Sequence, residues 1–181
     1  PSFGPEYVES YELGFKYDSN DKPFSVSGAV FQMDYTDIQV RTQNPGFVGF
    51  FEANVGSAEI SGFELESKLA FADYWFIEAA VGYTDAKFTN IDVEPPLAAV
   101  VTVDSKFDHV PEWSGNISLA RDVEFENGSL VTTRLSANYH TEYFNNPDNT
   151  AGIVTPEVTL VDLTVLWRSP DEVYGVDFGL K

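Results

Sequence analysis

The sequence lacks several features, and each absence excludes a class of protein. It contains no cysteine, which excludes disulfide bonds, thiolate metal sites and cysteine nucleophiles. It contains no run of the roughly 18 apolar residues that a membrane-spanning helix needs, and the most notable apolar stretch is residues 97–101. A helical membrane protein is therefore excluded. Strands can still cross a bilayer, because each needs only about 9–11 residues of alternating character.

Basic residues are also few, with 10 Lys and Arg against 29 Asp and Glu and a formal net charge of -19. The basic residues are scattered along the chain, so the phosphates of a nucleic acid would be repelled and we expect no DNA or RNA partner. The 43% of hydrophobic residues suffices for one ordinary domain, here residues 1–181 as a single unit. Because the chain starts at Pro1 with no basic and apolar leader, we expect a fragment or a processed piece.

The dominant positive feature is an alternation of polar and apolar residues, clearest in residues 54–69. In an extended strand successive side chains point to opposite faces. The polar face then holds Gly62, Glu64, Glu66 and Lys68, and the apolar face holds Phe63, Leu65 and Leu69. Such a strand belongs to a sheet with water on one side and either a protein core or lipid on the other.

The same alternation recurs along the chain and predicts about eight strands. We place them near residues 7–17, 24–40, 54–69, 75–84, 113–120, 131–140, 160–167 and 174–181. In the second strand we assign Ala29, Phe31, Met33 and Tyr35 to the apolar face. The polar face then holds Gly28, Gln32, Asp34 and Thr36, and Val30 is the apolar exception on it. The pair Asn127-Gly128 is a strong hairpin signal.

Three properties of these strands favour lipid over a protein core. The strand over residues 24–40 is far longer than the globular mode of about 5–6 residues. Short connections alternate with long ones, as in outer-membrane barrels. The long connections are residues 41–53, 90–110 and 145–156. Aromatic residues near strand ends on the apolar face suit the two membrane interfaces, namely Tyr17, Tyr35, Tyr74, Trp75, Tyr83, Trp113, Tyr139 and Trp167. The predicted fold is all-β, an antiparallel transmembrane β-barrel segment with alternating short turns and long loops.

Few residues could serve as metal ligands or catalytic groups, and these few lack the spacing of a known site. The histidines His109 and His140 lie far apart in sequence, and although Asp108 and Glu112 are near the first of them, we expect no metal site. Glu64 and Glu66 share one face as a glycosidase pair might, yet a hydrated wall with Lys68 nearby explains them better. The serines of the polar face, Ser114, Ser118 and Ser136, need no catalytic explanation. We therefore expect no enzyme, no catalytic residue and no cofactor.

Five segments together resemble the later barrel strands of TonB-dependent outer-membrane receptors. They are residues 5–16, 31–40, 54–66, 82–86 and 110–113, which include Asn54-Val55-Gly56, Gly62-Phe63-Glu64-Leu65-Glu66 and Val110-Pro111-Glu112-Trp113. The resemblance covers almost the whole chain, but no plug, energy-coupling box or last strand is recognisable. It implies the C-terminal third of a twenty-two-stranded barrel in the outer membrane of a Gram-negative bacterium.

The resemblance also implies partners and a function. These are outer-membrane lipid, the remaining barrel strands and plug, the TonB energy-coupling system, and a scarce nutrient such as a ferric siderophore, haem, cobalamin or an oligosaccharide. The long loops are either a solvated surface or the site of substrate capture, with contact residues unspecified. Two alternatives are a small closed outer-membrane barrel of about eight strands with a structural or adhesive role, and a soluble acidic β-sandwich that binds carbohydrate.

Overall fold

The computed structural model describes residues 3–19, 23–42, 51–93, 101–171 and 174–180, which form strands, turns and loops. The strands are β1 (Tyr7–Asp18), β2 (Phe24–Thr42), β3 (Phe51–Ala72), β4 (Trp75–Ile91), β5 (Trp113–Glu124), β6 (Leu130–His140), β7 (Tyr143–Phe144), β8 (Val154–Thr155), β9 (Val158–Arg168) and β10 (Gly175–Leu180). The described residues include no helix that is long and apolar enough to span a membrane. The predicted all-β class is confirmed, and each of the eight predicted strands overlaps one strand of the structure.

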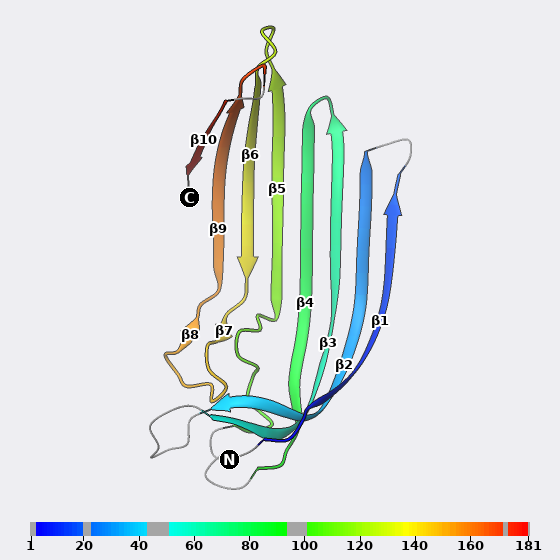
Figure 1. The fold of residues 1–181 in the computed structure, drawn as a ribbon, viewed down its shortest axis with the longest axis vertical. Helices are drawn as coiled ribbons and strands as arrows, with labels where there is room; N and C mark the ends of the chain where they lie inside the picture. Colours follow the sequence, from blue (N-terminus) through cyan, green and yellow to red (C-terminus); the bar gives the residue numbers. More distant parts are fainter. Residues whose placement is uncertain (1–2, 20–22, 43–50, 94–100, 172–173, 181) are drawn as a thin grey trace.

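Eight strands form one antiparallel sheet in the order β1-β2-β3-β4-β5-β6-β9-β10, while β7 and β8 form a separate two-stranded ribbon between β6 and β9 (Figure 1). The short turns lie at one end, the turn end, at the top of Figure 1. The long connections from β4 to β5 and from β6 to β9 lie at the other end, the loop end. In the described residues β1 and β10 remain the two edges of a single layer, which is neither a closed eight-stranded barrel nor a sandwich.

The register between strands places residues of one character in the same row. One row of the apolar face runs through Leu13, Val30, Phe63, Tyr83 and Trp113 on five consecutive strands. A row of the polar face runs through Gly14, Ala29, Glu64, Gly82, Ser114 and His140. The apolar face is uncovered, with Leu13 75% and Ile117 50% exposed. A face of this kind needs an apolar medium or another protein layer to cover it.

Strand β2 has the opposite facing from the one predicted. Phe31 lies between Glu12 and Gly62 in the register, so it belongs to the polar face together with Ala29, Met33 and Tyr35. Val30, which lies between Leu13 and Phe63, belongs to the apolar face, and so do Gly28, Gln32, Asp34 and Thr36. The prediction was wrong because β2 carries apolar side chains on both faces, so that its own alternation does not decide the facing.

Aromatic side chains gather at two levels of the apolar face. Toward the loop end the rings of Phe63, Tyr83 and Trp113 pack together, and the last two have centroids 4.8 Å apart. Toward the turn end the guanidinium carbon of Arg121 lies 5.2 Å from the centre of the Trp75 ring. Roughly eight residues of strand separate the levels, which at roughly 3.3 Å per residue and a tilt of roughly 40° corresponds to roughly 20 Å.

The buried hydrophobic cluster lies at the loop end, where β2 and β3 bend across the bottom of the view (Figure 1). Its members are Ile38, Val40, Val55, Ala58, Phe88 and Val101, and Tyr35 packs against it instead of joining the aromatic residues of the apolar face. Two irregularities shape this region, since Asp37 has a φ of 57° and Gly56 a φ of 140°. A Cβ at Gly56 would lie 2.1 Å from the carbonyl oxygen of Asn90, so only glycine fits there.

The strands extend further at the loop end than the alternation predicted. The predicted connection over residues 41–53 is strand up to Thr42 and again from Phe51, while residues 43–50 lie outside the described residues. Strand β4 continues to Ile91, beyond the expected end at residue 84. In β4 the alternation ends at residue 84 because the charged residues Asp85 and Lys87 occupy positions of the apolar parity, before the register shift next to Ser57.

Candidate functional site

The two long connections at the loop end are joined by hydrogen bonds. The backbone N–H of Lys106 donates to Oδ1 of Asn149 at 2.5 Å, and Nδ2 of Asn149 donates to the carbonyl oxygen of Lys106 at 2.8 Å. The backbone of Asp108 forms a parallel bridge with Phe144, and the N–H of His109 donates to the Phe144 carbonyl at 2.8 Å. Residues 101–112 of the β4–β5 connection and residues 141–157 of the β6–β9 connection therefore form one hydrogen-bonded unit, which we call the loop pair.

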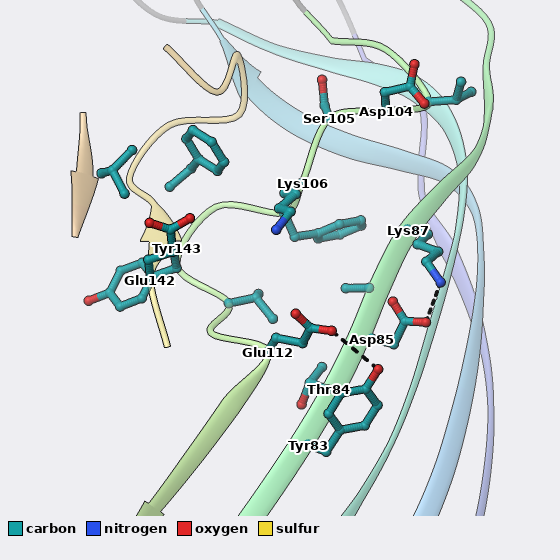
Figure 2. A pocket seen from close by; sticks show the side chains of 16 residues that line it. Tyr83, Thr84, Asp85, Lys87, Asp104, Ser105, Lys106, Glu112, Glu142 and Tyr143 are labelled. Atoms are coloured by element: carbon teal, nitrogen blue, oxygen red, sulfur yellow. Dashed lines mark hydrogen bonds and ion pairs between the residues drawn. The ribbon is translucent and has the colours of Figure 1, made fainter. Parts of the chain in front are cut away.

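A cavity of about 430 Å³ lies between β4 and the loop pair (Figure 2). Its lining from β4 is Tyr83, Thr84, Asp85, Ala86 and Lys87, and its lining from the loop pair is Val103, Asp104, Ser105, Lys106, Phe107, Val110, Glu112, Glu142, Tyr143, Phe144 and Val154. In the described part of the chain, β4 beyond Tyr83 pairs with the returning chain at two places, and the cavity lies between the two segments. The Thr84 N–H donates to the carbonyl of Glu112, and Lys87 forms an isolated bridge with Lys106.

Charged groups dominate the polar part of this lining. The ammonium group of Lys87 pairs with the carboxylate of Asp85, and the Tyr83 hydroxyl donates to Glu112 at 3.5 Å, as the dashed lines in Figure 2 show. The side chains of Asp104 and Glu142 also line the cavity. Carboxylates therefore outnumber cationic side chains around the cavity, in keeping with the acidity of the whole chain.

The fold brings together the two histidines that are distant in sequence. The rings of His109 and His140 lie 6.2 Å and 5.3 Å from the ring of Tyr143. His109 Nδ1 lies 3.1 Å from the carboxylate of Asp108, and His140 Nδ1 lies 2.9 Å from the carbonyl oxygen of Thr141. Across the described residues no three His, Asp or Glu side chains come close enough to hold a metal ion. The two histidines accordingly flank an aromatic side chain of the cavity wall.

The other residues singled out in the sequence lie on the polar face. Glu64 and Glu66 border a shallow concavity together with Glu12 and Lys16. Lys68, expected to compensate the two glutamates, instead pairs with Glu78 at 3.3 Å. Glu78 also accepts a hydrogen bond from Arg134 at 3.1 Å, and Arg134 donates a second one to Ser118 at 3.1 Å, while Ser114 and Ser136 follow the same face. This arrangement is a polar wall rather than a catalytic pair.

Sequence reasoning did not single out Lys106, Tyr143 or Asn149. The run Asn145-Asn146-Pro147-Asp148-Asn149 contains the residue types that favour turns, and the sequence predicts it as part of the long connection over residues 145–156. The left-handed φ of 49° at Asn149 is one that asparagine tolerates well. The signal for a structured loop was therefore present, whereas its contact with Lys106 depends on how the two connections fold together.

The sequence of this chain is similar to a known family of β-barrel proteins. Residues 1–180 match the family model described as TonB dependent receptor-like, beta-barrel. The probable TonB-dependent siderophore receptor PiuA of Acinetobacter baumannii is 29% identical over 86 residues, which make up 48% of this chain and 11% of that protein. The ferrichrome outer membrane transporter/phage receptor of Escherichia coli (strain K12) is 32% identical over 88 residues, which make up 49% of this chain and 11% of that protein.

Solved structures share the fold over nearly the whole chain. The ferric yersiniabactin uptake receptor FyuA from Yersinia pestis superposes with a TM-score of 0.74 at 21% identity, covering 93% of this chain and 23% of that receptor. The ferric preacinetobactin receptor BauA from Acinetobacter baumannii gives a TM-score of 0.68 at 17% identity, covering 98% of this chain and 25% of that receptor. The chain thus spans about a quarter of the length of these receptors, and its eight-stranded sheet has the fold of part of their barrel wall.

Proposed function

The chain belongs to the TonB-dependent receptor β-barrel family, and from this membership we propose that it is part of an outer-membrane receptor that binds and imports a scarce nutrient. The observation that carries the proposal is the match of the family model to residues 1–180. Both curated relatives are named for siderophores or ferrichrome, which makes a ferric siderophore the favoured cargo. We propose no enzymatic role, because this is a family of receptors.

The proposed location is the outer membrane of a Gram-negative bacterium, with the apolar face against lipid. Support comes from the exposed side chains of Leu13, Leu65 and Ile117, and from aromatic residues at both borders of the apolar rows. Beyond the loop-end border the same face carries charge, since Asp34 lies opposite Glu9 and Glu59 in the register. A lipid-facing wall has this order, with an apolar band of roughly 25 Å between two aromatic girdles.

The proposed partners include the rest of the receptor. Among the described strands, β1 and β10 each have one side without a neighbour, and a bilayer cannot solvate the backbone groups of such an edge. We propose that further barrel strands pair with these edges, that a plug fills the space beside the polar face, and that a TonB-type coupling protein supplies energy. Short turns lie on the periplasmic rim of such barrels, so the loop pair and its cavity would face the outside.

The experiment that tests the function uses the receptor expressed from its complete reading frame. A strain that lacks the gene is grown under iron limitation, and uptake of isotope-labelled iron from a set of ferric siderophores is measured with and without the restored gene. We expect uptake of at least one complex that depends on both the gene and the energised inner membrane. Uptake that is equal in both strains for every complex would contradict the proposal and favour a structural role in the outer membrane.

The identity of the metal needs a separate measurement. One of the structures with the same fold is the copper transporter OprC, so the fold by itself does not choose iron. The same pair of strains is therefore compared for copper accumulation. Gene-dependent accumulation of copper without gene-dependent uptake of iron would replace the favoured cargo while leaving the transport function intact.

A further inference from the structure

We propose that residues 3–6 are a latch, which holds the connection that enters β1 against the bent ends of β2 and β3 and opens while the strands stay paired. These bent ends, residues 38–42 and 51–56, are called the β2–β3 ribbon below. The inference rests on the proposed function in one respect, because it takes the residues before β1 as a connection of a larger barrel. Figure 1 shows the N-terminal segment meeting the ribbon at the loop end.

The chain before β1 leaves the backbone ladder of the sheet. Continuing the register of β1 and β2 would place Gly4 opposite Gln39. Pro5 has no backbone N–H to donate to such a ladder, and β2 carries a bulge at Asp37, which has a φ of 57°. The carboxylate of Glu6 replaces the missing ladder partner, since its Oε2 accepts the backbone N–H of Gln39 at 2.9 Å.

Asn54 of β3 closes the latch. Its Oδ1 accepts the backbone N–H of Gly4 at 2.7 Å, and its Nδ2 donates to the carbonyl oxygen of Gly4 at 3.2 Å. Nε2 of Gln39 also donates to this carbonyl, at 3.0 Å. The same Nδ2 of Asn54 donates to the carbonyl oxygen of Asp37 at 2.6 Å, so that one amide holds both the latch and the bulge.

The latch lies on the face of the β2–β3 ribbon that is opposite to the buried hydrophobic cluster. Gln39 is paired with Asn54, and in the next pair Val40 is a member of the cluster and Ala53 packs against it. Successive side chains of a strand point to opposite faces, so the latch and the cluster are on different sides of the ribbon. The cluster also contains Val101 of the loop pair. Opening of the latch therefore leaves the cluster and the loop pair in place.

The latch belongs to the part of the molecule that opens most easily. Residues 3–6 are all exposed, so hydrogen bonds and not apolar burial hold them. Removal of one hydrogen bond changes an equilibrium by roughly two- to tenfold, whereas a continuous ladder holds each strand. Segments held in this way open locally without global unfolding. Opening adds residues 3–6, or roughly 13 Å of extended chain, to the reach of the connection before β1.

Native-state amide exchange of the full-length receptor, resolved to single residues, tests whether the latch opens as one unit. Two amides report on it through different acceptors, since Gly4 donates to Asn54 and Gln39 donates to Glu6. In Asn54→Ala we expect exchange at both amides to become about tenfold faster or more, and Glu6→Ala should also accelerate both. Acceleration of only the amide whose own acceptor is removed would show independent hydrogen bonds and would overturn the inference.

Two variants control for the substitution itself. Asn54→Asp keeps the acceptor for the Gly4 N–H and loses the donor, so we expect a smaller acceleration of both reporter amides than in Asn54→Ala. Asn116→Ala removes an exposed amide from β5 and should leave both reporters unchanged. Should Asn54→Ala lose the protection of β4, Asn54→Asp and Glu6→Ala make the same comparison in folded receptor.

A third amide separates the latch from the rest of the loop end. The backbone N–H of Lys106 is held by Asn149 in the loop pair, and we expect its exchange to stay unchanged in every latch variant. Faster exchange at Lys106 in step with Gly4 and Gln39 would mean that the whole loop end opens together, which contradicts a separate latch. If the reporters respond as expected but the receptor shows no gene-dependent uptake, the proposed function fails and the latch stands.

Discussion

Asn149 holds both backbone groups of Lys106, a residue 43 positions earlier in the chain, through the two ends of its side-chain amide. A backbone pairing with a strand would use the same two groups, so the amide replaces a missing strand neighbour. The backbone N–H and the Nδ2 of Asn149 also donate to the carbonyl of Asn146, at 3.2 Å and 3.3 Å. Through this side chain, together with the bridge between Asp108 and Phe144, the β6–β9 connection holds residues 106–109 beside the cavity.

We predict that Asn149→Ala separates the loop pair without unfolding the sheet. The variant loses two hydrogen bonds that are each worth about 0.5–1.5 kcal/mol, so local opening becomes easier by about 1–2 kcal/mol. Amide hydrogen exchange of residues 103–110 should become roughly 5–30 times faster in the full-length receptor, while amides in the middle of β4 and β5 keep their protection.

Two further variants serve as controls for this effect. Asn149→Asp keeps the acceptor for the Lys106 N–H and loses the donor, so its exchange rates should lie between those of the parent and of Asn149→Ala. Asn116→Ala removes an exposed amide from the polar face of β5 and should change nothing at the loop end. Unchanged exchange in Asn149→Ala would mean that the bridge between Asp108 and Phe144 is enough to hold the loops together.

The wall of the sheet could be predicted from the sequence because one simple rule governs it. Side chains alternate between two faces. In seven of the eight strands of the main sheet the apolar residues lie mainly on one of these faces, as Leu13 does in β1 and Leu163 in β9. Hairpin turns at Asn127-Gly128 and before Trp75 then set the order of the strands. In these seven strands the local pattern and the final structure agree.

The loop end could not be predicted because its contacts join distant segments. The stacked rings of Phe88 and Phe107, with centroids 4.5 Å apart, connect β4 to the chain that returns toward β5, and no local periodicity marks this pair. The cavity depends on the same long-range contacts, so its lining residues were not identified. For β2 the rule itself failed, since the facing of Phe31 is decided by Glu12 and Gly62 on the neighbouring strands.

We predict that Gly62→Ala destabilises the sheet. A Cβ at this position would lie 2.2 Å from the carbonyl oxygen of Tyr83 and 2.6 Å from Cζ of Phe31, so both the backbone of β4 and an aromatic ring would have to move. Overpacking of this kind typically costs about 1–3 kcal/mol. The midpoint of denaturant unfolding of the receptor in detergent measures the loss. Gly82→Ala in the neighbouring strand is the matched control, because the nearest atom to its added Cβ is Oγ of Ser114 at 3.4 Å, and a similar loss there would contradict the steric explanation.

The proposed lipid contact predicts opposite outcomes for two adjacent residues of β4. Val81 lies in register with Leu65 on the apolar face, and Ala80 lies in register with Glu66 on the polar face. Val81→Lys should destabilise the receptor in bilayers by about 1–3 kcal/mol, because a lysine between the midplane and the loop-end border still faces hydrocarbon. Ala80→Lys should change stability by less than about 1 kcal/mol, since its ammonium group faces water and a glutamate. Equal losses in both variants would remove the support for a lipid-facing wall.

The facing of β2 predicts a labelling pattern, and the absence of cysteine from this chain makes the measurement simple. Ala29→Cys places a thiol beside Glu64 on the polar face, whereas Val30→Cys places it between Leu13 and Phe63 on the apolar face. A charged maleimide reacts with thiolates in water and does not enter hydrocarbon. In membranes that contain the receptor, Ala29→Cys should therefore react and Val30→Cys should stay largely unmodified, while both should react after denaturation. The reverse pattern would restore the facing that the alternation of β2 predicted, and would require the register between β2 and β3 to shift by one residue.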